Sequence, residues 1–518
     1  MVLPASNPTK SYWIEAAESP LRHYRSTETL PESVDVVIVG AGYAGAATAY
    51  WIHKYTAAAA RQPQVAILEA RDVCGCATGR NGNYALTAVA ITLCKALTIS
   101  SAGGQLRPHL YSRYPAWAER FGPDGAMELI KHEMAHLAAF NQLAKEEGIV
   151  EETCLEFGET FDAAMTEEAW TRVKRALEIM RADHGDENDI VRSCRLIEDA
   201  CEAQSFTQMK DCKGAVAHPA GQIWPYKFVH AIIRILLEAG NLNLQAHTPV
   251  QTISDSRDDG WINVKTDRGS IRTRAVVHAT NAFASHLLPE FENLIKPEIS
   301  TLAAIPAPSK FIKHTGAQHW DSTVNNYHLQ LPPPHNAIIL GGGRQFLVHR
   351  PDQCFLSARD DQQILGIAQF FESWPASDVV GGSASIPAKL AMPEDQGGYW
   401  TGVETSSADS FPFVGSVPGR RGQFIAAGFA GHGMPRILLS AAHIAPLILQ
   451  SIGAEHTMPE LAKTHPVLPK PFLATAERIE NLQSTDWQKK AAAYRQSCEE
   501  SAAKPFCRDT RSMPQWSN

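Results

Sequence analysis

The chain is poor in the features that direct a protein to a membrane or a nucleic acid. No apolar run reaches the roughly 18 residues that a membrane-spanning helix needs. The net charge is −8 and no run of basic residues is present, which argues against nucleic acid or an anionic membrane surface as the main partner. The first residues lack the pattern of a signal peptide, and the last match no peroxisomal or prenylation signal. We therefore expect a cytoplasmic protein.

Cysteines are also sparse, with ten in 518 residues. Only Cys74 and Cys76 form a tight pair, and a metal site there would need two further ligands at motif spacing, which are not present nearby. Free thiols in a reducing compartment are the expectation. The 44% of hydrophobic and 20% of charged residues are typical of a globular chain, and the length predicts two to four domains or one large composite domain.

Against this background, one strong local signal lies near the N-terminus. Residues 35–39 form an apolar run that suits a strand buried on both faces. Gly40, Gly42 and Gly45 follow at once and lead into a helical stretch. The first glycine permits a tight turn, the second lets the backbone approach a pyrophosphate, and the third lets the helix pack on the strand. The helix N-terminus would offer N–H groups and a positive dipole end to the phosphates.

A second apolar strand strengthens this interpretation. Residues 65–68 end at Glu69, and an acid at the tip of the second strand accepts hydrogen bonds from the adenosine ribose hydroxyls. Strand, glycines, helix, strand and acid in this order predict a dinucleotide-binding unit.

The loop after Glu69 indicates which dinucleotide is bound. Residues 70–83 read Ala-Arg-Asp-Val-Cys-Gly-Cys-Ala-Thr-Gly-Arg-Asn-Gly-Asn. This loop resembles the pyrophosphate loop of the FAD-dependent D-amino-acid oxidase and glycine oxidase superfamily, in the form of its gamma-glutamylputrescine-oxidase-like branch. The extra Cys76 and the Asn83 in place of a last glycine depart from that form. The loop offers backbone N–H groups and the Thr78 hydroxyl to phosphate or flavin oxygens.

Further segments resemble the same family in the right order. They are residues 222–228 before an amphipathic helix, 247–250, 275–282, 409–415 and 424–434. The resemblance implies FAD as the cofactor, with the Val250 backbone at the adenine and the N–H groups of the last segment at the flavin pyrimidine. The residues expected to bind FAD are Gly40, Gly42, Tyr43, Ala44, Gly45, Glu69, Ala70, Arg71, Ala77, Thr78, Gly79, Arg80, Asn81, Gly82, Val250, Thr280, Asn281, Asp409, Gly428, Gly431, His432, Gly433 and Met434.

The expected fold class is α/β. A Rossmann-type FAD-binding domain of the glutathione-reductase-like kind would be joined to an α+β substrate domain whose mixed or antiparallel sheet roofs the flavin. The expected segments are an N-terminal extension (1–29), a discontinuous FAD-binding domain (30–115, 216–290 and 400–455), a substrate domain (116–215 and 291–399) and a C-terminal helical tail (456–518). Within these, residues 125–147, 166–183 and 474–500 are expected to be helical.

One motif points elsewhere. His132, Glu133 and His136 match the zinc-protease pattern on a predicted helix. The rest of the chain resembles FAD proteins, and His136 shares a helix face with Leu129, Phe140 and Leu143. We therefore interpret it as a packed histidine, and we expect no metal site.

The catalytic candidates are Tyr327, His328 and Arg344 on the predicted roof and His432 on the last glycine loop. Each has a structural alternative, because Tyr327 and His328 can pack, Arg344 can form a surface pair and His432 can serve its loop. An amine must lose its ammonium proton before a hydride leaves, so an apolar pocket or a base is needed.

Two departures from relatives bear on the chemistry. In related sarcosine and fructosyl-amine oxidases a cysteine tethers FAD, but residues 401–405 here contain none, so FAD is expected to be non-covalent. Those relatives also carry an oxygen-activating lysine where the best match here, residues 337–341, has isoleucine. O2 as electron acceptor is therefore less secure than FAD.

The leading hypothesis is oxidation of a C–N bond in a small amine or amino acid, giving an imine. One alternative is a flavoprotein that tailors a secondary metabolite by dehydrogenation or oxidative cyclisation. Another is a non-catalytic FAD-binding subunit. Neither the substrate nor the oligomeric state follows from the sequence.

Overall fold

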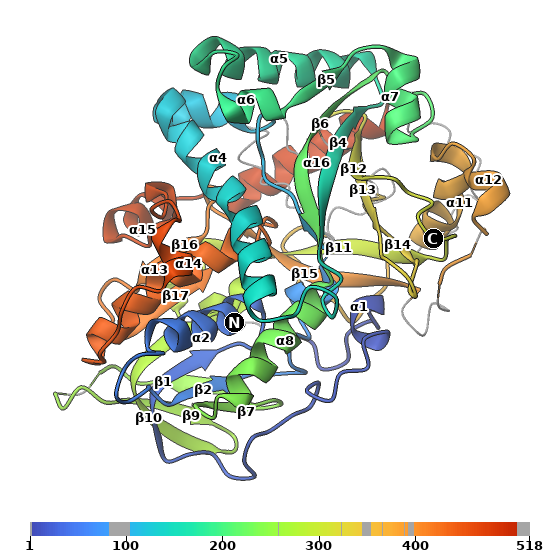
Figure 1. Cartoon of the computed structure of the whole chain (residues 1–518). Helices are drawn as coiled ribbons and strands as arrows, with labels where there is room; N and C mark the ends of the chain where they lie inside the picture. Colours follow the sequence, from blue (N-terminus) through green and yellow to red (C-terminus); the bar gives the residue numbers. More distant parts are fainter. Residues whose placement is uncertain are drawn as a thin grey trace.

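The computed structural model describes residues 3–81, 104–256, 258–322, 324–343, 354–364, 366–387, 389–391 and 398–504. Two sheets dominate it, one at the bottom of Figure 1 and one above (Figure 1). Among the helices in these ranges, none has both the length and the apolar character needed to cross a bilayer.

The first sheet has the order β16-β17-β10-β1-β2-β7, with β8 and β9 attached beside β10. The pairs β17–β10, β10–β1, β1–β2 and β2–β7 are all parallel. Its strands are β1 (Ser33–Val39), β2 (Val65–Leu68), β7 (Leu242–Gln245), β8 (Val250–Ile253), β9 (Ile262–Thr266), β10 (Gly269–His278), β16 (Phe413–Ser416) and β17 (Gln423–Ala427). β2 is buried along its whole length and β1 from Val36 to Val39, which explains their unbroken apolar sequences.

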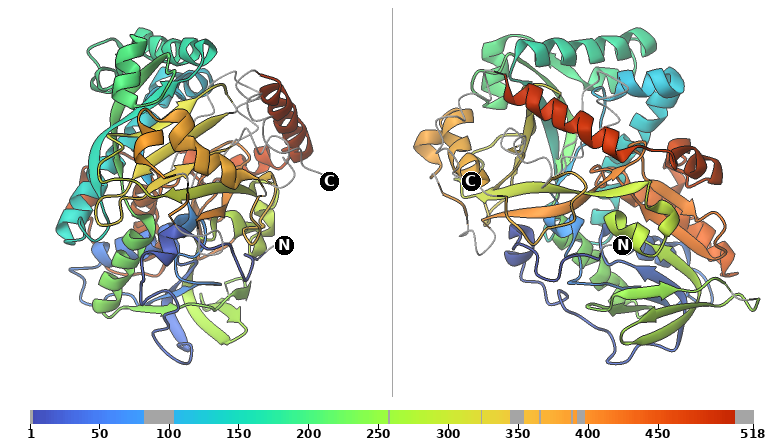
Figure 2. Two further views of the ribbon diagram at one scale, coloured as in Figure 1. Left: turned by 90° about the vertical axis from the view of Figure 1, so that its right-hand side faces the viewer. Right: turned by 180° about the vertical axis from the view of Figure 1, so that it is seen from behind.

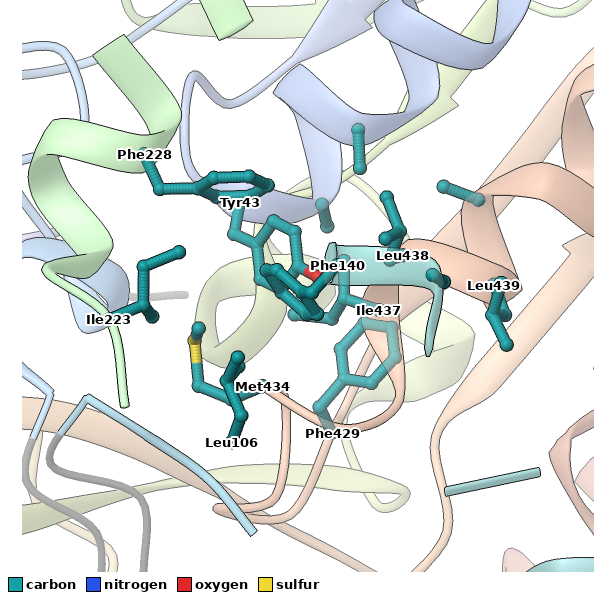
Figure 3. Packing of buried hydrophobic residues seen from close by; sticks show 14 of the residues in the cluster. Tyr43, Leu106, Phe140, Ile223, Phe228, Phe429, Met434, Ile437, Leu438 and Leu439 are labelled. Carbon is teal, nitrogen blue, oxygen red and sulfur yellow. The ribbon is translucent and has the colours of Figure 1, made fainter. Parts of the chain in front are cut away.

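Three helices pack beside this sheet and meet in one apolar cluster. They are α2 (Tyr43–Tyr55), α8 (Pro225–Glu238) and α13 (Ile437–Ser451). Tyr43 of α2 lies edge-on to Phe228 of α8, with ring centroids 5.6 Å apart, and Phe140 packs against both rings (Figure 3). The N-terminus of α2 is thereby fixed relative to the carboxyl end of β1.

The second sheet has the order β15-β11-β14-β13-β12-β4-β6-β3, with β5 beside β6. It is mixed, because β12 and β4 are parallel whereas the other pairs are antiparallel. Its strands are β3 (Gln105–Leu106), β4 (Glu156–Ala164), β5 (Arg195–Ile197), β6 (Gly214–Gln222), β11 (Ile295–Ile305), β12 (Thr315–His319), β13 (Asn325–Gln330), β14 (Ile338–Gly341) and β15 (Tyr399–Ser407). The predicted fold class is confirmed.

Most of the remaining helices lie around the second sheet, and the last three belong to the C-terminal part of the chain (Figure 2). They are α1 (Tyr12–Glu15), α4 (Tyr114–Glu146), α5 (Glu167–His184), α6 (Asp189–Ser193), α7 (Ala200–Thr207), α11 (Ile367–Asp378), α12 (Gly382–Ser385), α14 (Glu460–Lys463), α15 (Ala476–Leu482) and α16 (Trp487–Ala502), with short 3-10 turns at η1 (Ala77–Arg80), η2 (Asn281–His286), η3 (Pro289–Phe291) and η5 (Lys470–Phe472). The helices predicted near 125–147 and 166–183 are confirmed as α4 and α5. α4 begins earlier than expected and is interrupted at Gly122, whose φ is 74°, just before Pro123.

The division into domains stays a prediction, but two of its boundaries need correction. Residues 216 and 400 fall inside β6 and β15, which both belong to the second sheet. The predicted tail contains α15 and α16, and Trp487 and Tyr494 of α16 are buried against Phe355. The tail therefore packs into the molecule.

Candidate active site

A cavity opens where the carboxyl ends of β1 and β2 meet the N-terminus of α2. It encloses about 1280 Å³, including its open mouth. The residues predicted to bind the cofactor that line it are Gly40, Gly42, Tyr43, Ala44, Glu69, Ala70, Ala77, Thr78, Asn81, Val250, Thr280, Asn281, Gly431, Gly433 and Met434. Segments far apart in the sequence thus converge on one space, as the carboxyl-end rule for parallel sheets requires.

The three glycines at the start of α2 have different surroundings. A Cβ on Gly45 would lie 2.0 Å from the Gly40 carbonyl oxygen, so this residue lets the helix pack on the strand. Gly40 has a φ of 108°, and a Cβ there would lie 2.8 Å from the Ala279 oxygen. A Cβ on Gly42 would meet only Thr78 Oγ1, at 3.7 Å. Gly42 is therefore the glycine whose freedom serves the cavity, whereas Gly45 serves packing.

The N-terminus of α2 presents donors to the cavity. No side chain caps the helix at Gly42, and the Tyr43 N–H donates to Thr78 Oγ1 over a long 3.3 Å. The first N–H groups of a helix have no partner within the helix. Together with the helix dipole they form an anion-binding end beside the Thr78 hydroxyl.

Glu69 lies at the tip of β2, as predicted, and lines the cavity. Its Oε2 accepts from the Ala41 N–H at 2.8 Å and its Oε1 accepts from the Arg71 N–H at 2.9 Å. Burial raises the pKa of the carboxyl group, while these backbone donors act in the opposite direction. Each oxygen has a further lone pair that a ribose hydroxyl can use.

Replacing Glu69 by alanine should weaken FAD binding by about 1–3 kcal/mol, the usual cost of losing a hydrogen bond to a charged acceptor. The measurement is fluorescence titration of the apoprotein with FAD. Glu69→Gln is the graded control. Because it keeps one acceptor oxygen, its affinity for FAD should lie between those of the wild type and Glu69→Ala. An alanine variant with wild-type affinity would show that the ribose is held elsewhere.

Buried polar atoms on the cavity wall show that a polar ligand fits there. Thr280 Oγ1 and Asn81 Oδ1 are buried and have no hydrogen-bond partner within the part of the chain that the structure describes. Both residues line the cavity. Because unpaired buried polar atoms are costly, a ligand with hydroxyl or amide groups would stabilise this wall.

Asn281 joins two turns that the sequence places far apart. Its φ is 45°, and its Oδ1 accepts from the Gly428 N–H at 3.0 Å and the Phe429 N–H at 3.2 Å. Asn281 therefore fixes the second glycine loop, residues 428–434, against the end of β10. Gly428 contributes its backbone to this link and does not line the cavity.

Arg71, Gly79 and Arg80 support the cavity wall from behind and do not line it. Arg71 pairs with the fully buried Asp360 at 2.9 Å, and Arg80 Nε lies 3.5 Å from the same carboxylate. Burial lowers the pKa of Arg80 to about 10. A Cβ on Gly79 would lie 2.0 Å from the Cys74 oxygen. Contact of Arg71, Gly79 and Arg80 with the cofactor stays a prediction, and the structure gives these residues a packing role behind the wall.

Asp409, which was predicted to bind the cofactor, has its partner in the C-terminal tail. Its carboxylate is buried and pairs with Arg478 of α15, at 2.9 Å and 3.0 Å. It lies away from the cavity wall and anchors the C-terminal tail. The sequence could not reveal this pairing, because the two residues are separated by several elements.

His432 lies in a buried cluster beneath the cavity. Its Nε2 is 2.9 Å from Glu133 Oε2, and its ring stacks on His109 with centroids 3.8 Å apart. Glu133 Oε1 accepts from Arg436 Nε at 2.8 Å, and Oε2 accepts from the His109 N–H at 2.7 Å. Burial lowers the pKa of His432 to about 4, so a neutral imidazole donates to the carboxylate. Burial opposes ionisation of Glu133, but His432 and Arg436 hold its pKa at about 2.

His432 was predicted to be a catalytic and cofactor-binding residue, with service to its loop as the alternative, and its contacts with Glu133 and His109 favour that alternative. Only its neighbours Gly431 and Gly433 line the cavity. The zinc-protease-like motif belongs to the same buried cluster, because its Glu133 is the carboxylate that pairs with His432 and Arg436. His136 is buried, with Nδ1 2.8 Å from the His132 oxygen and Nε2 accepting from the Leu439 N–H.

The two neighbouring roof candidates point to opposite faces of the second sheet, as alternation along a strand requires. His328 packs between Phe161 and Trp374 on the face covered by α11, and burial lowers its pKa to about 3. Its predicted catalytic role is therefore not supported. Tyr327 lies on the face that also carries Leu329, which belongs to the apolar cluster that includes residues of α2 and α13, whereas Tyr327 itself clusters with Ala317. Gly82 and Arg344 lie outside the described residues.

A further charged cluster on that face of the sheet was missed in the sequence. Asp162 pairs with Arg107 at 2.5 Å and His319 at 2.6 Å, and accepts from the Tyr111 hydroxyl at 2.6 Å. Burial would raise the pKa of Asp162, but Arg107, His218 and His319 hold that pKa well below the usual range. No local motif marks these residues, since their partners come from distant segments.

The N-terminal Leu3 and Pro4, which were not predicted as site residues, also line the cavity.

Residues 35–447 match the family model described as DAO, FAD dependent oxidoreductase. The match spans most of the chain, so the protein belongs to the DAO family of FAD-dependent oxidoreductases. It is an enzyme of that class with FAD as its cofactor. No curated protein matches the chain at a significant level.

Several solved structures share the fold. Glycine oxidase from Geobacillus kaustophilus is 21% identical with a TM-score of 0.61, covering 86% of this chain and 99% of its own. L-proline dehydrogenase from P. horikoshii is 18% identical with a TM-score of 0.57, covering 84% and 98%. L-amino acid deaminase from Proteus vulgaris, with its specific insertion sequence deleted, is 17% identical with a TM-score of 0.58, covering 88% and 97%.

Proposed function

We propose that this enzyme oxidises a C–N bond of a small amine or amino acid by hydride transfer to FAD, giving an imine. The observation that carries the proposal is the convergence of Glu69, the α2 N-terminus and the loop 428–434 on one cavity, in a chain of the DAO family. The three similar structures are named for enzymes of amino acids, which favours this substrate class. Within this family, we infer membership of the gamma-glutamylputrescine-oxidase-like branch from the resemblance of the loop at residues 70–83.

Different residues of the cavity wall would each hold a different part of FAD. The α2 N-terminus and Thr78 would bind the pyrophosphate, and Glu69 the ribose hydroxyls. The Val250 backbone would contact the adenine. FAD, when bound, supplies the acceptor for the hydride that leaves the substrate carbon.

The other end of the cavity would surround the ring system. The N–H groups of Gly431 and Gly433 would face the pyrimidine, where negative charge develops on reduction. Phe429 and Met434 are buried there and exclude water. Such apolar surroundings favour the neutral form of an amine over the ammonium. Tyr327 stays a catalytic candidate because its side chain lies on the sheet face opposite to that of His328, but it is buried beside Ala317 and is not part of the described cavity wall.

We also propose that FAD is bound without a covalent link and that O2 is the electron acceptor. Gly402 stands in β15 where a tether cysteine would be expected, and a Cβ at that position would lie 2.7 Å from the Arg80 oxygen. The strand is therefore packed too closely against η1 to carry a side chain on that side.

An anaerobic reduction screen tests the proposal. The FAD-bound protein is mixed in a stopped-flow cell with primary amines, secondary amines and amino acids, and absorbance near 450 nm is followed, with free FAD as the control. We expect rapid bleaching by at least one member, reoxidation on adding O2, and release of FAD on acid precipitation. Bleaching by dithionite but by no amine would overturn the substrate class and favour a tailoring reaction or a non-catalytic role. Flavin that stays with the precipitate would overturn non-covalent binding.

A further inference from the structure

Two imidazoles and a carboxylate converge on the surface beside the cofactor cavity. Asp72 Oδ1 lies 2.9 Å from His23 Nδ1 and 3.0 Å from His247 Nε2. The two imidazole nitrogens are 3.1 Å apart. Within the described ranges, this is the one group of three or more histidine, cysteine or acidic side chains whose ligand atoms could hold a single metal ion.

The triangle of ligand atoms has the dimensions of a coordination face. An ion with bonds of about 2.1 Å places neighbouring ligand atoms about 3.0 Å apart in octahedral geometry and about 3.4 Å apart in tetrahedral geometry. The separations of 2.9, 3.0 and 3.1 Å match the octahedral value more closely. Hydrogen bonding alone explains the triangle less well. If both nitrogens donate to Asp72 Oδ1, two N–H groups are brought within 3.1 Å of each other without a bond between them. A shared cation would remove this conflict, because all three atoms then offer lone pairs.

Asp72 and His247 are each held in place by contacts that leave their ligand atoms available. Arg22 Nε donates to the other oxygen of Asp72, Oδ2, at 2.8 Å. Arg25 Nη2 donates to the His247 carbonyl oxygen at 3.1 Å, and the His247 N–H donates to the Arg71 oxygen. Groups behind the first ligands orient them in metal sites in this way. Glu15 pairs with Arg22 at 3.1 Å and offsets its positive charge.

The backbone at His247 supports the same conclusion. Its φ of 49° lies in the left-handed region, which residues other than glycine adopt uncommonly, although histidine does so more often than most. Such a conformation has a free-energy cost that a functional contact of the side chain can offset. The side chains of His23 and His247 are 63% and 45% exposed, so an ion has direct access from solvent and water can complete its coordination.

We propose that His23, Asp72 and His247 bind one divalent transition-metal ion of the Zn²⁺, Ni²⁺ or Co²⁺ class. Imidazole nitrogen with a single carboxylate suits these ions better than Ca²⁺ or Mg²⁺, which prefer all-oxygen sites. The ion joins the segment around residue 23 to the loops after β2 and before β8. The site does not depend on the proposed reaction.

The site would also stabilise the adenosine end of the cavity. Asp72 follows Glu69 by three positions, and the Thr248 N–H donates to the Glu69 carbonyl oxygen at 2.7 Å. An ion bound by His247 and Asp72 would therefore restrain two backbone segments next to Glu69. One is the loop that follows Glu69, and the other is the segment that donates a hydrogen bond to it. We expect a bound ion to raise the thermal midpoint of the FAD-bound protein, since a ligand that binds only the folded state stabilises it.

The test uses FAD-bound full-length protein without a polyhistidine tag, stripped with EDTA and dialysed. Zn²⁺ and Ni²⁺ are titrated by calorimetry, and Co²⁺ by its visible absorption. We expect about one ion per chain, and at least a tenfold loss of affinity in His23→Ala and Asp72→Asn. His456→Ala is the control, because that half-buried histidine is outside the proposed site: its Nδ1 contacts the Ala454 oxygen and its ring lies edge-on to Tyr55.

His23→Ala is the decisive variant, since an exposed side chain can be removed without disturbing the fold. Unaltered flavin absorbance in that variant checks that the cofactor is retained. The proposal is overturned if the wild-type protein binds none of the three ions, or if His23→Ala binds them as tightly as the wild type. Neither result depends on turnover, so they are distinguishable from a failure of the proposed reaction.

Discussion

Replacing Glu133 by alanine is expected to destabilise the protein by about 3–5 kcal/mol, the usual cost of removing one partner of a buried ion pair. Glu133 is 1% exposed, and it pairs with Arg436 and His432 from the far end of the chain. Its removal leaves the Arg436 guanidinium buried without its carboxylate. The N–H groups of His109 and His432 lose their acceptor as well.

The effect should extend to the cofactor. His432 lies between Gly431 and Gly433, so loss of its anchor frees the backbone that lines the cavity. We expect weaker FAD retention in Glu133→Ala than in wild type. Urea unfolding followed by circular dichroism measures the stability, and flavin fluorescence measures release of FAD.

Glu147→Ala provides the matched control at the end of the same helix. Glu147 pairs with Lys54 at 3.1 Å, with side chains 16% and 26% exposed, and it also accepts from the Tyr50 hydroxyl at 2.8 Å. A partly exposed ion pair contributes about 0–1 kcal/mol and a hydrogen bond about 1 kcal/mol, so this variant should lose clearly less stability than Glu133→Ala. If Glu133→Ala is no less stable than this control, the cluster does not act as a buried hub, and the loop 428–434 is held by Asn281 alone.

Local sequence patterns indicated many of the residues that line the cavity, whereas the buried ion pairs were not predicted. The turn from Gly40 to Gly45 and the acid Glu69 depend on residues close in the sequence, so their spacing indicated them, whereas the Thr78 loop was indicated by its resemblance to a family's pyrophosphate loop. Glu133 was recognised only as part of a zinc-like motif. Its partners His109, His432 and Arg436 come from other elements, and no spacing rule connects them.

Strand register set a second limit. His328 and Tyr327 are adjacent in β13, and a shift of one residue exchanges the two faces of a sheet. Both faces of β13 are buried, so the sequence lacks the polar alternation that would have shown which residue faces the cavity. Only the contacts of His328 with Trp374 and Phe161 decide the question.

Replacing Gly45 by alanine is expected to weaken FAD binding by about 2–3 kcal/mol, or roughly 30- to 150-fold. The added Cβ would lie 2.0 Å from the Gly40 oxygen and 3.3 Å from Ile38 Cγ2. Backbone atoms cannot move aside as a flexible side chain can, so α2 must shift away from β1. That shift displaces the helix N-terminus from the position where its N–H groups face the cavity.

Two further glycines separate this effect from general intolerance to alanine. Gly42→Ala should keep the wild-type thermal midpoint of the apoprotein but weaken FAD, because its Cβ meets only Thr78 Oγ1 at 3.7 Å and occupies cavity space. Gly158→Ala should change neither property, since nothing in the structure lies within 4 Å of its Cβ. Affinity is measured by fluorescence titration and stability by thermal unfolding of each apoprotein. Wild-type FAD affinity in Gly45→Ala would mean that α2 can move without loss of the anion-binding end, and the pyrophosphate would then be held mainly by the loop around Thr78.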